Sequence, residues 1–139
     1  MKIFTFFILL LLIFSIYSSF VFAAYKANEI QVAKDTLLQY LSKRSQGKII
    51  ECKSFLSKNF LQEFINKFGS DYVNYYRWEK EEIYINFKII NALKTKDLIT
   101  IKVSVEVQGE GYTDKAIEDY TMGHEEGRWK IVDYAIEYK

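Results

Sequence analysis

The residues of this chain that could carry acid–base chemistry are few and lie in its last quarter. Asp119, Asp133 and His124 are candidate proton acceptors, and the chain is rich in tyrosines that could donate a hydrogen bond to a carbonyl oxygen. A carboxylate or imidazole base beside a tyrosine donor is an arrangement that removes a proton next to a carbonyl group. These three residues are therefore the candidate catalytic residues.

Each of the three also has a structural explanation. His124 is the only histidine and adjoins an expected hairpin turn, where an exposed histidine usually has no chemical role. Asp119 fits a solvated position on a strand, although an inward position is also open. Asp133 interrupts the alternation of Trp129 and Ile131, which predicts either a β-bulge or a carboxylate that faces a pocket.

Other chemistries lack their residue sets, so no cofactor and no metal is expected. Glu125 and Glu126 adjoin His124, but neighbouring strand residues point to opposite faces and no second histidine completes a zinc site. The glycines at 109 and 111 open no helix, which argues against a phosphate loop. A serine nucleophile would lack a histidine placed to serve it.

Four aromatic residues close together form the most distinctive local cluster. Tyr72, Tyr75, Tyr76 and Trp78 lie between the expected helices and strands. Such rings could form a binding rim for a peptide, a glycan or an envelope protein, or they could instead fill the wide end of the fold.

Composition limits the class of partner and the means of stabilisation. After residue 23 the chain has 18 basic and 18 acidic residues, and this balance argues against nucleic acid as a partner. A homodimer through the sheet face is possible.

Cys52 is the only cysteine, which excludes an internal disulfide. A buried thiol is expected there, with an intermolecular disulfide or a reactive thiol as alternatives.

The N-terminal segment predicts where the protein works. Residues 3–23 carry no charge, and the run ends in Val21-Phe22-Ala23, which fits a signal peptidase site before Ala24. A helix of this length would also span roughly 30 Å of hydrocarbon. The expectation is a signal peptide over 1–23 and a single domain over 24–139 in an extracytoplasmic location; the alternative is a retained membrane anchor.

The period of the apolar residues changes along the domain. Apolar residues spaced three and four apart predict a first helix over 28–44, with Asn28 as its N-cap and Gly47 at its C-terminal end. They predict a second helix that begins at about Ser54 or Ser57, runs to Phe68 and is closed by Gly69. The segment 71–78 is too short to classify.

Alternation of period two follows and predicts four strands. They are expected over 82–92, 98–107, 116–124 and 128–138, with turns at 94–97, 109–114 and 125–127, the last using Gly127. Ile83, Ile85, Phe87 and Ile89 should share one face, opposite Tyr84. Helices followed by a strand meander predict an α+β domain with N-terminal helices packed on a four-stranded antiparallel sheet.

Two local patterns resemble the nuclear transport factor 2-like superfamily, in particular its small exported bacterial members. The first is Ser54-Phe55-Leu56-Ser57-Lys58-Asn59-Phe60 at the start of the second helix, and the second is Gly127-Arg128-Trp129-Lys130-Ile131-Val132 at the last strand. The resemblance covers roughly residues 28–138. It implies a strongly bent sheet that wraps the first helix into a cone with a pocket at its open end.

Three functions remain open at this stage. The first is an exported binding or interaction domain of the cell envelope or secreted fraction, without catalysis. The second is a small lyase or isomerase that works in the pocket, with Asp133, Asp119 or a tyrosine as acid or base. The third is a membrane-anchored assembly component of an envelope machine.

Overall fold

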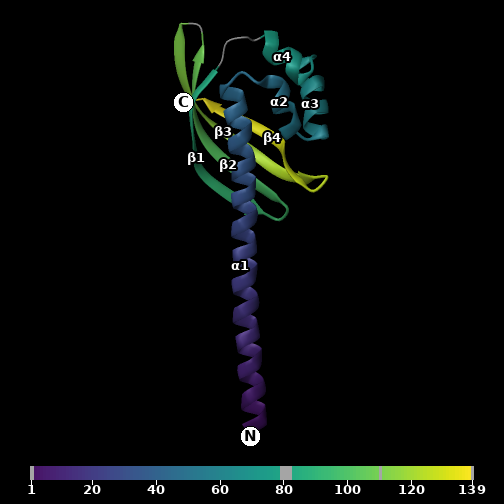
Figure 1. The fold of residues 1–139 in the computed structure, drawn as a ribbon, viewed down its shortest axis with the longest axis vertical. Coiled ribbons are helices and arrows are strands. Elements are labelled where there is room, and N and C mark those ends of the chain that lie inside the picture. The colour runs from purple at the N-terminus through teal and green to yellow at the C-terminus, as the bar shows by residue number, and fades with distance from the viewer. Residues whose placement is uncertain (1, 79–82, 110, 139) are drawn as a thin grey trace.

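A long helix leads into an α+β domain in the computed structural model, which describes residues 2–78, 83–109 and 111–138 (Figure 1). The helices and strands follow one another in the order α1, α2, a short 3₁₀ helix η1, α3, α4 and then β1 to β4. The α+β class expected from the sequence is confirmed.

Helix α1 (Lys2–Ser45) runs without a break through the expected cleavage site. The prediction that a helix begins at an Asn28 N-cap is wrong, since Asn28 lies inside α1. No glycine or proline precedes Gly47, so nothing in the backbone chemistry ends the helix earlier. Side chains 11–28 are all exposed, and α1 contains a stretch long and apolar enough to cross a membrane.

The C-terminal half of α1 supplies the helical side of the core. Ala33, Leu37 and Leu41 are fully buried, and Tyr40 is nearly so. Their spacing places one stripe of α1 against the sheet, as the three- and four-residue steps predict. An ion pair between Glu29 and Lys94 joins the lower end of this stripe to β1.

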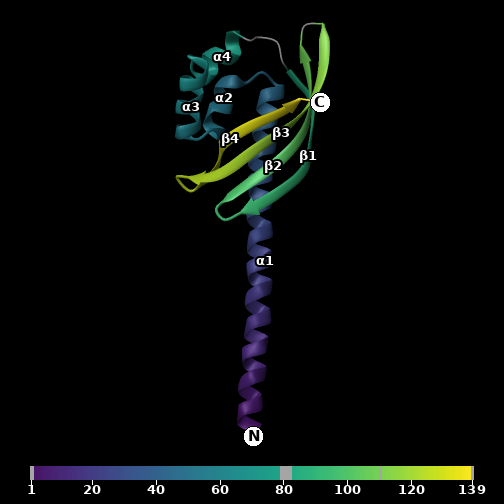
Figure 2. The same cartoon turned by 180° about the vertical axis from the view of Figure 1, so that it is seen from behind.

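The remaining helices cluster beside the upper end of α1, next to β4 (Figure 2). They are α2 (Ile49–Cys52), η1 (Lys53–Phe55), α3 (Lys58–Phe68) and α4 (Tyr72–Trp78). Two predicted ends of α3 are confirmed: the Ser57 hydroxyl accepts a hydrogen bond from the Phe60 N–H at 3.1 Å, and Gly69 closes the helix with φ of 68°.

The sheet is open and antiparallel, with the order β1-β2-β3-β4. Its strands are β1 (Ile83–Thr95), β2 (Leu98–Gly109), β3 (Tyr112–Glu125) and β4 (Arg128–Tyr138). The amide N–H of Ser57 donates to the carbonyl oxygen of Ile131 at 2.9 Å, which ties the start of α3 to β4.

The predicted strand faces hold for β2 and fail for part of β1. Ile99, Ile101, Val103, Val105 and Val107 of β2 are all buried, as expected. In β1, the structure buries Tyr84 and leaves Ile85 about half exposed, which reverses the prediction there. The register shifts between Tyr84 and Asn86, and a shift of one residue moves side chains to the opposite face.

A second register shift re-aims the end of β4. Thr121 pairs with Asp133 whereas Met122 pairs with Ile131, so Val132 is the extra residue of a β-bulge. Without it, the alternation of Trp129 and Ile131 would continue through Asp133. With it, Tyr134 takes the inward position.

Candidate functional site

A buried carboxylate lies at the centre of the domain. Glu118 on β3 is only 3% exposed, and its carboxylate accepts hydrogen bonds from three tyrosine hydroxyls. Tyr84 and Tyr134 donate to Oε1 at 2.9 and 2.8 Å, and Tyr120 donates to Oε2 at 2.7 Å. Hydrogen bonds to an ionised acceptor are stronger than neutral ones, and this set offsets part of the cost of burying the charge.

Three strands bring this group together. Tyr120 lies two residues after Glu118 on β3 and so shares its face. Tyr134 is the direct partner of Tyr120 across the β3–β4 ladder, and its inward position depends on the bulge at Val132. Tyr84 comes from β1, where its own register shift turns it inward. We call Glu118, Tyr84, Tyr120 and Tyr134 the Glu118 cluster.

The surroundings of the Glu118 cluster are aromatic and cationic. The guanidinium of buried Arg44 lies 5.1 Å from the centroid of the Tyr84 ring, within cation–π range. The Tyr40 ring meets the Tyr120 ring edge-on at a centroid distance of 5.9 Å. Burial is the main cause that raises the pKa of Tyr120 well above its usual value, so this phenol stays protonated at neutral pH.

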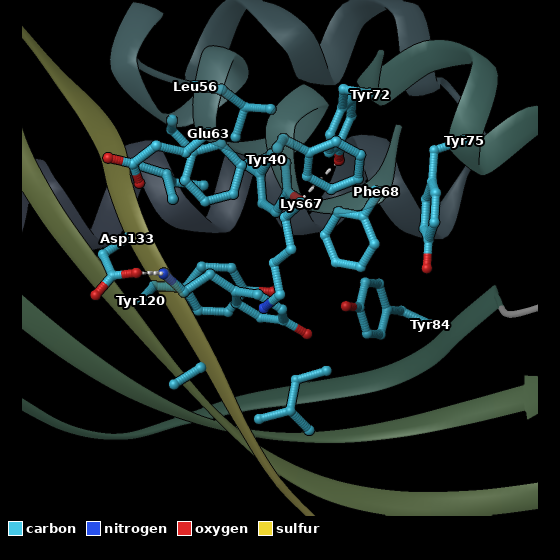
Figure 3. Close-up of a pocket in the computed structure, with 16 residues that line it drawn as sticks. Tyr40, Leu56, Glu63, Lys67, Phe68, Tyr72, Tyr75, Tyr84, Tyr120 and Asp133 are labelled. Atoms are coloured by element: carbon cyan, nitrogen blue, oxygen red, sulfur yellow. Dashed lines mark hydrogen bonds between the residues drawn. The ribbon is translucent and has the colours of Figure 1, made fainter. Parts of the chain in front are cut away.

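A cavity of about 600 Å³ lies between the sheet and helices α3 and α4 (Figure 3). This volume is in the range of small-molecule sites. Most of its lining side chains are aromatic: Tyr40, Phe60, Phe64, Phe68, Tyr72, Tyr75, Tyr84, Tyr120 and Tyr134. Three tyrosines of the Glu118 cluster thus form part of its wall.

The helical wall is built from rings that pack on one another. The Phe64 ring contacts Tyr72 and Tyr75 in edge-to-face geometry, with centroids 5.4 and 5.1 Å apart. The ring centroids of Phe68 and Tyr75 lie 4.7 Å apart. The hydroxyls of Tyr40 and Tyr72 are joined by a hydrogen bond of 2.8 Å. Such contacts fix the rings in place and define the shape of the wall.

Three charged residues also line the cavity: Glu63, Lys67 and Asp133. Figure 3 shows the Lys67 side chain reaching into the space between the helices and the sheet. Its amino nitrogen lies 5.3 Å from the centroid of the Phe68 ring. The lining of the cavity therefore combines many aromatic side chains with a few charged residues.

The three sequence-predicted acid–base residues do not meet in one site. Asp133 is exposed and is among the residues around the cavity, but its neighbour Tyr134 takes the inward position, so the Asp133 carboxylate points to the outer face (Figure 3). Asp119 also lies on the outer face of the sheet, where it accepts a hydrogen bond from Lys102 at 3.0 Å. His124 is exposed near the β3–β4 turn and stacks on Trp129 with ring centroids 3.8 Å apart.

The predicted aromatic rim is only partly exposed. Tyr72 is 2% exposed and belongs to the core, while Tyr75 is half-buried and lines the cavity. The side chains of Tyr76 and Trp78 lie outside the described residues. The first half of this segment therefore faces inward, toward the cavity.

Cys52 and the expected cleavage site have separate environments. The thiol of Cys52 is fully buried, and burial raises its pKa to about 11. Ala23 and Ala24 are exposed positions within α1.

Within the part of the chain that the structure describes, no group of three histidine, cysteine, aspartate or glutamate side chains could hold a metal ion.

Sequence reasoning missed the Glu118 cluster, although one signal was present. Ala116, Tyr120 and Met122 alternate on the inward face of β3, and Glu118 falls in the same phase. An acid in an otherwise apolar stripe is the mark of a buried, hydrogen-bonded carboxylate. The two bulges that aim Tyr84 and Tyr134 at it leave no comparable signal.

Comparisons with known proteins support a fold and no family. No protein-family model and no curated protein matches this chain. A similar solved structure is the solution structure of RPA3114, a SEC-C motif containing protein from Rhodopseudomonas palustris. The TM-score is 0.53 at 11% identity, over 76% of this chain and 88% of that one.

These findings correct the family resemblance drawn from the sequence. The nuclear transport factor 2-like assignment is wrong by this comparison, since the similar structure is a SEC-C motif containing protein. Its two supporting patterns encode generic features, a helix cap at Ser57 and a hairpin glycine at 127. The cone shape stays a prediction, and neither secretion nor a membrane location is supported by this similarity.

Proposed function

We propose that this domain is a binding module that holds a small, largely apolar ligand in the aromatic cavity, without catalysing a reaction on it. The observation that carries the proposal is the cavity itself, with its volume of about 600 Å³ and its packed aromatic wall. Pockets of this kind bind through apolar contact and use a few polar groups to orient the ligand.

The state of the Glu118 cluster favours binding over catalysis. A general base needs a carboxylate that can reach the substrate proton. The Glu118 carboxylate instead accepts hydrogen bonds from Tyr84, Tyr120 and Tyr134, and those phenols separate it from the cavity. Asp133 lines the cavity but is exposed, and neither Asp119 nor His124 is among the lining residues. The cluster thus serves as a rigid wall.

Binding of indole, a small neutral aromatic probe, tests the proposal. We expect indole to bind the full-length chain in a neutral maltoside detergent. We expect Ile136→Trp to abolish binding because Ile136 lines the cavity and pairs with Glu118 on the inward face of the sheet. The control is Thr100→Trp, which adds the same ring at an exposed position on β2. The proposal fails if the folded wild-type protein does not bind indole, or if both variants bind it equally.

We also propose an extracytoplasmic location for the domain. The uncharged run 3–23 supports export, and the continuous helix α1 is compatible with either a cleaved signal or a retained anchor. N-terminal sequencing of native material separates the two. A start at Ala24 supports secretion, and a start at Met1 in the membrane fraction supports anchoring.

A further inference from the structure

The cavity of the proposed binding module has the features of a site for a positively charged group. Its walls are made of tyrosine and phenylalanine rings, whose faces carry partial negative charge. An ammonium group within about 6 Å of such a ring centroid is attracted to it, and more strongly when water is excluded.

The charged side chains around the cavity balance one another. Glu63 lines it, and Glu118 lies directly behind its tyrosine wall. The cations are Lys67, which lines the cavity, and Arg44 behind the Tyr84 ring. These side chains therefore leave no net positive charge that would oppose a cationic ligand.

The hydroxyl protons of the wall add a preference for a cationic ligand. Tyr120 donates its proton to Glu118, so toward any other group its oxygen can only accept a hydrogen bond. An N–H donor or an alkylammonium suits such a wall better than a carboxylate or phosphate does. An anionic ligand would also lie close to Glu118.

Lys67 shows that an ammonium group is accommodated here. Its amino nitrogen lies 5.3 Å from the Phe68 ring centroid, and its side chain reaches into the cavity (Figure 3). Lys67 is the one cation among the lining residues that the structure describes. It therefore takes up a position that a cationic ligand would occupy.

We propose that the ligand of this cavity is a small organic cation, a primary or quaternary ammonium compound, and that Lys67 competes with it for the aromatic wall. This inference rests on the proposed binding function and names the ligand class for it. Removal of the Lys67 charge should then strengthen binding, and removal of a nearby carboxylate should weaken it.

Three probes of the same shape and different charge test the inference on the full-length chain in a neutral detergent. They are choline, the neutral alcohol in which a tert-butyl group replaces the trimethylammonium group, and the carboxylate anion of tert-butylacetic acid. We expect choline to bind about tenfold more tightly than the alcohol, as one favourable cation–π contact predicts. The anion should bind more weakly than both.

Removing a positive or a negative charge near the cavity should change the affinity for choline in opposite directions. Lys67→Met, which keeps the stem and removes the charge, should tighten choline binding by about tenfold. Glu63→Gln, which removes a carboxylate that lines the cavity, should weaken it by about threefold. Asp119→Asn makes the same charge change on the opposite face of the sheet and should leave binding unchanged. Glu63 is exposed on α3, so its substitution tests the charge effect without disturbing the core.

The outcomes separate this inference from the proposed function. If the alcohol binds as tightly as choline, or if Lys67→Met weakens choline binding, the cation inference is wrong. If indole binds and choline does not, the binding function stands and the cation inference falls. If neither binds, both fall.

Discussion

Replacement of Glu118 by leucine should destabilise the domain through the tyrosines that the substitution leaves behind. Tyr84 and Tyr120 are 7% and 1% exposed, and each donates its hydroxyl to this carboxylate. A buried hydroxyl left without a partner costs about 1–3 kcal/mol. Tyr134 is only half-buried and lines the cavity, so water can satisfy it.

Two orphaned hydroxyls give a total of about 2–6 kcal/mol. The substitution also removes the desolvation penalty of a buried carboxylate, which lowers the net cost. We therefore expect Glu118→Leu to reduce the free energy of unfolding by about 2–4 kcal/mol. Denaturant unfolding of the full-length chain, followed by tryptophan fluorescence, measures it.

The neighbouring acid provides the control. Asp119 pairs with Lys102 on the outer face, where both side chains are more than a third exposed. Asp119→Leu should change the free energy of unfolding by less than about 1 kcal/mol, as for a surface ion pair.

A double-mutant cycle tests the mechanism itself. In a Tyr84→Phe background one hydroxyl is already absent, so Glu118→Leu should cost less than in the wild type by about 1 kcal/mol. Equal, small effects of the substitutions at 118 and 119 would refute the buried cluster.

Three further predictions follow from other parts of the domain. Trp129→Ala should lower the free energy of unfolding by about 3–5 kcal/mol because the Trp129 ring is buried, whereas His124→Ala should lower it by less than about 0.5 kcal/mol. Chemical denaturation of both variants measures this, and equal effects would contradict the prediction. Cys52 should not react with a thiol reagent at neutral pH until denaturant is added, since the thiol is buried with a pKa of about 11; fast labelling of the native protein would contradict this. The pKa of Tyr120 is raised in the folded state, so above the unfolded pKa of about 10 the unfolded chain releases the Tyr120 proton first, and the free energy of unfolding falls as pH rises. Tyr120→Phe should flatten this alkaline decline in unfolding experiments. An unchanged slope would contradict the assignment.

Local patterns in the sequence predicted the elements where one periodicity runs without interruption. The alternation of β2 from Ile99 to Val107 identified both the strand and its buried face. Ser57 and Gly69 fixed the ends of α3 because their roles depend on nearby backbone groups. The start of α1 was misplaced, since Asn28 can cap a helix but does not end one that already continues through it.

The candidate site was harder to predict because it depends on irregularities. The bulge at Val132 turns Tyr134 inward, and the register shift after Tyr84 has the same effect in β1. Neither shift follows from alternation, which assumes an unbroken period of two. Asp133 was recognised as a break in the pattern, but Glu118 was overlooked because acids are expected on the outer face of a strand.

The central claim, that the aromatic cavity binds a small ligand, is tested most directly by locating indole on the protein with NMR of isotope-labelled isoleucine and leucine methyl groups. Leu56, Ile131 and Ile136 line the cavity, and Ile90 and Leu93 are exposed on β1 away from it. We predict that indole shifts the signals of the first three methyl-bearing residues and leaves the other two unchanged. Shifts confined to Ile90 and Leu93, or no shifts at all at saturating indole, would contradict the account.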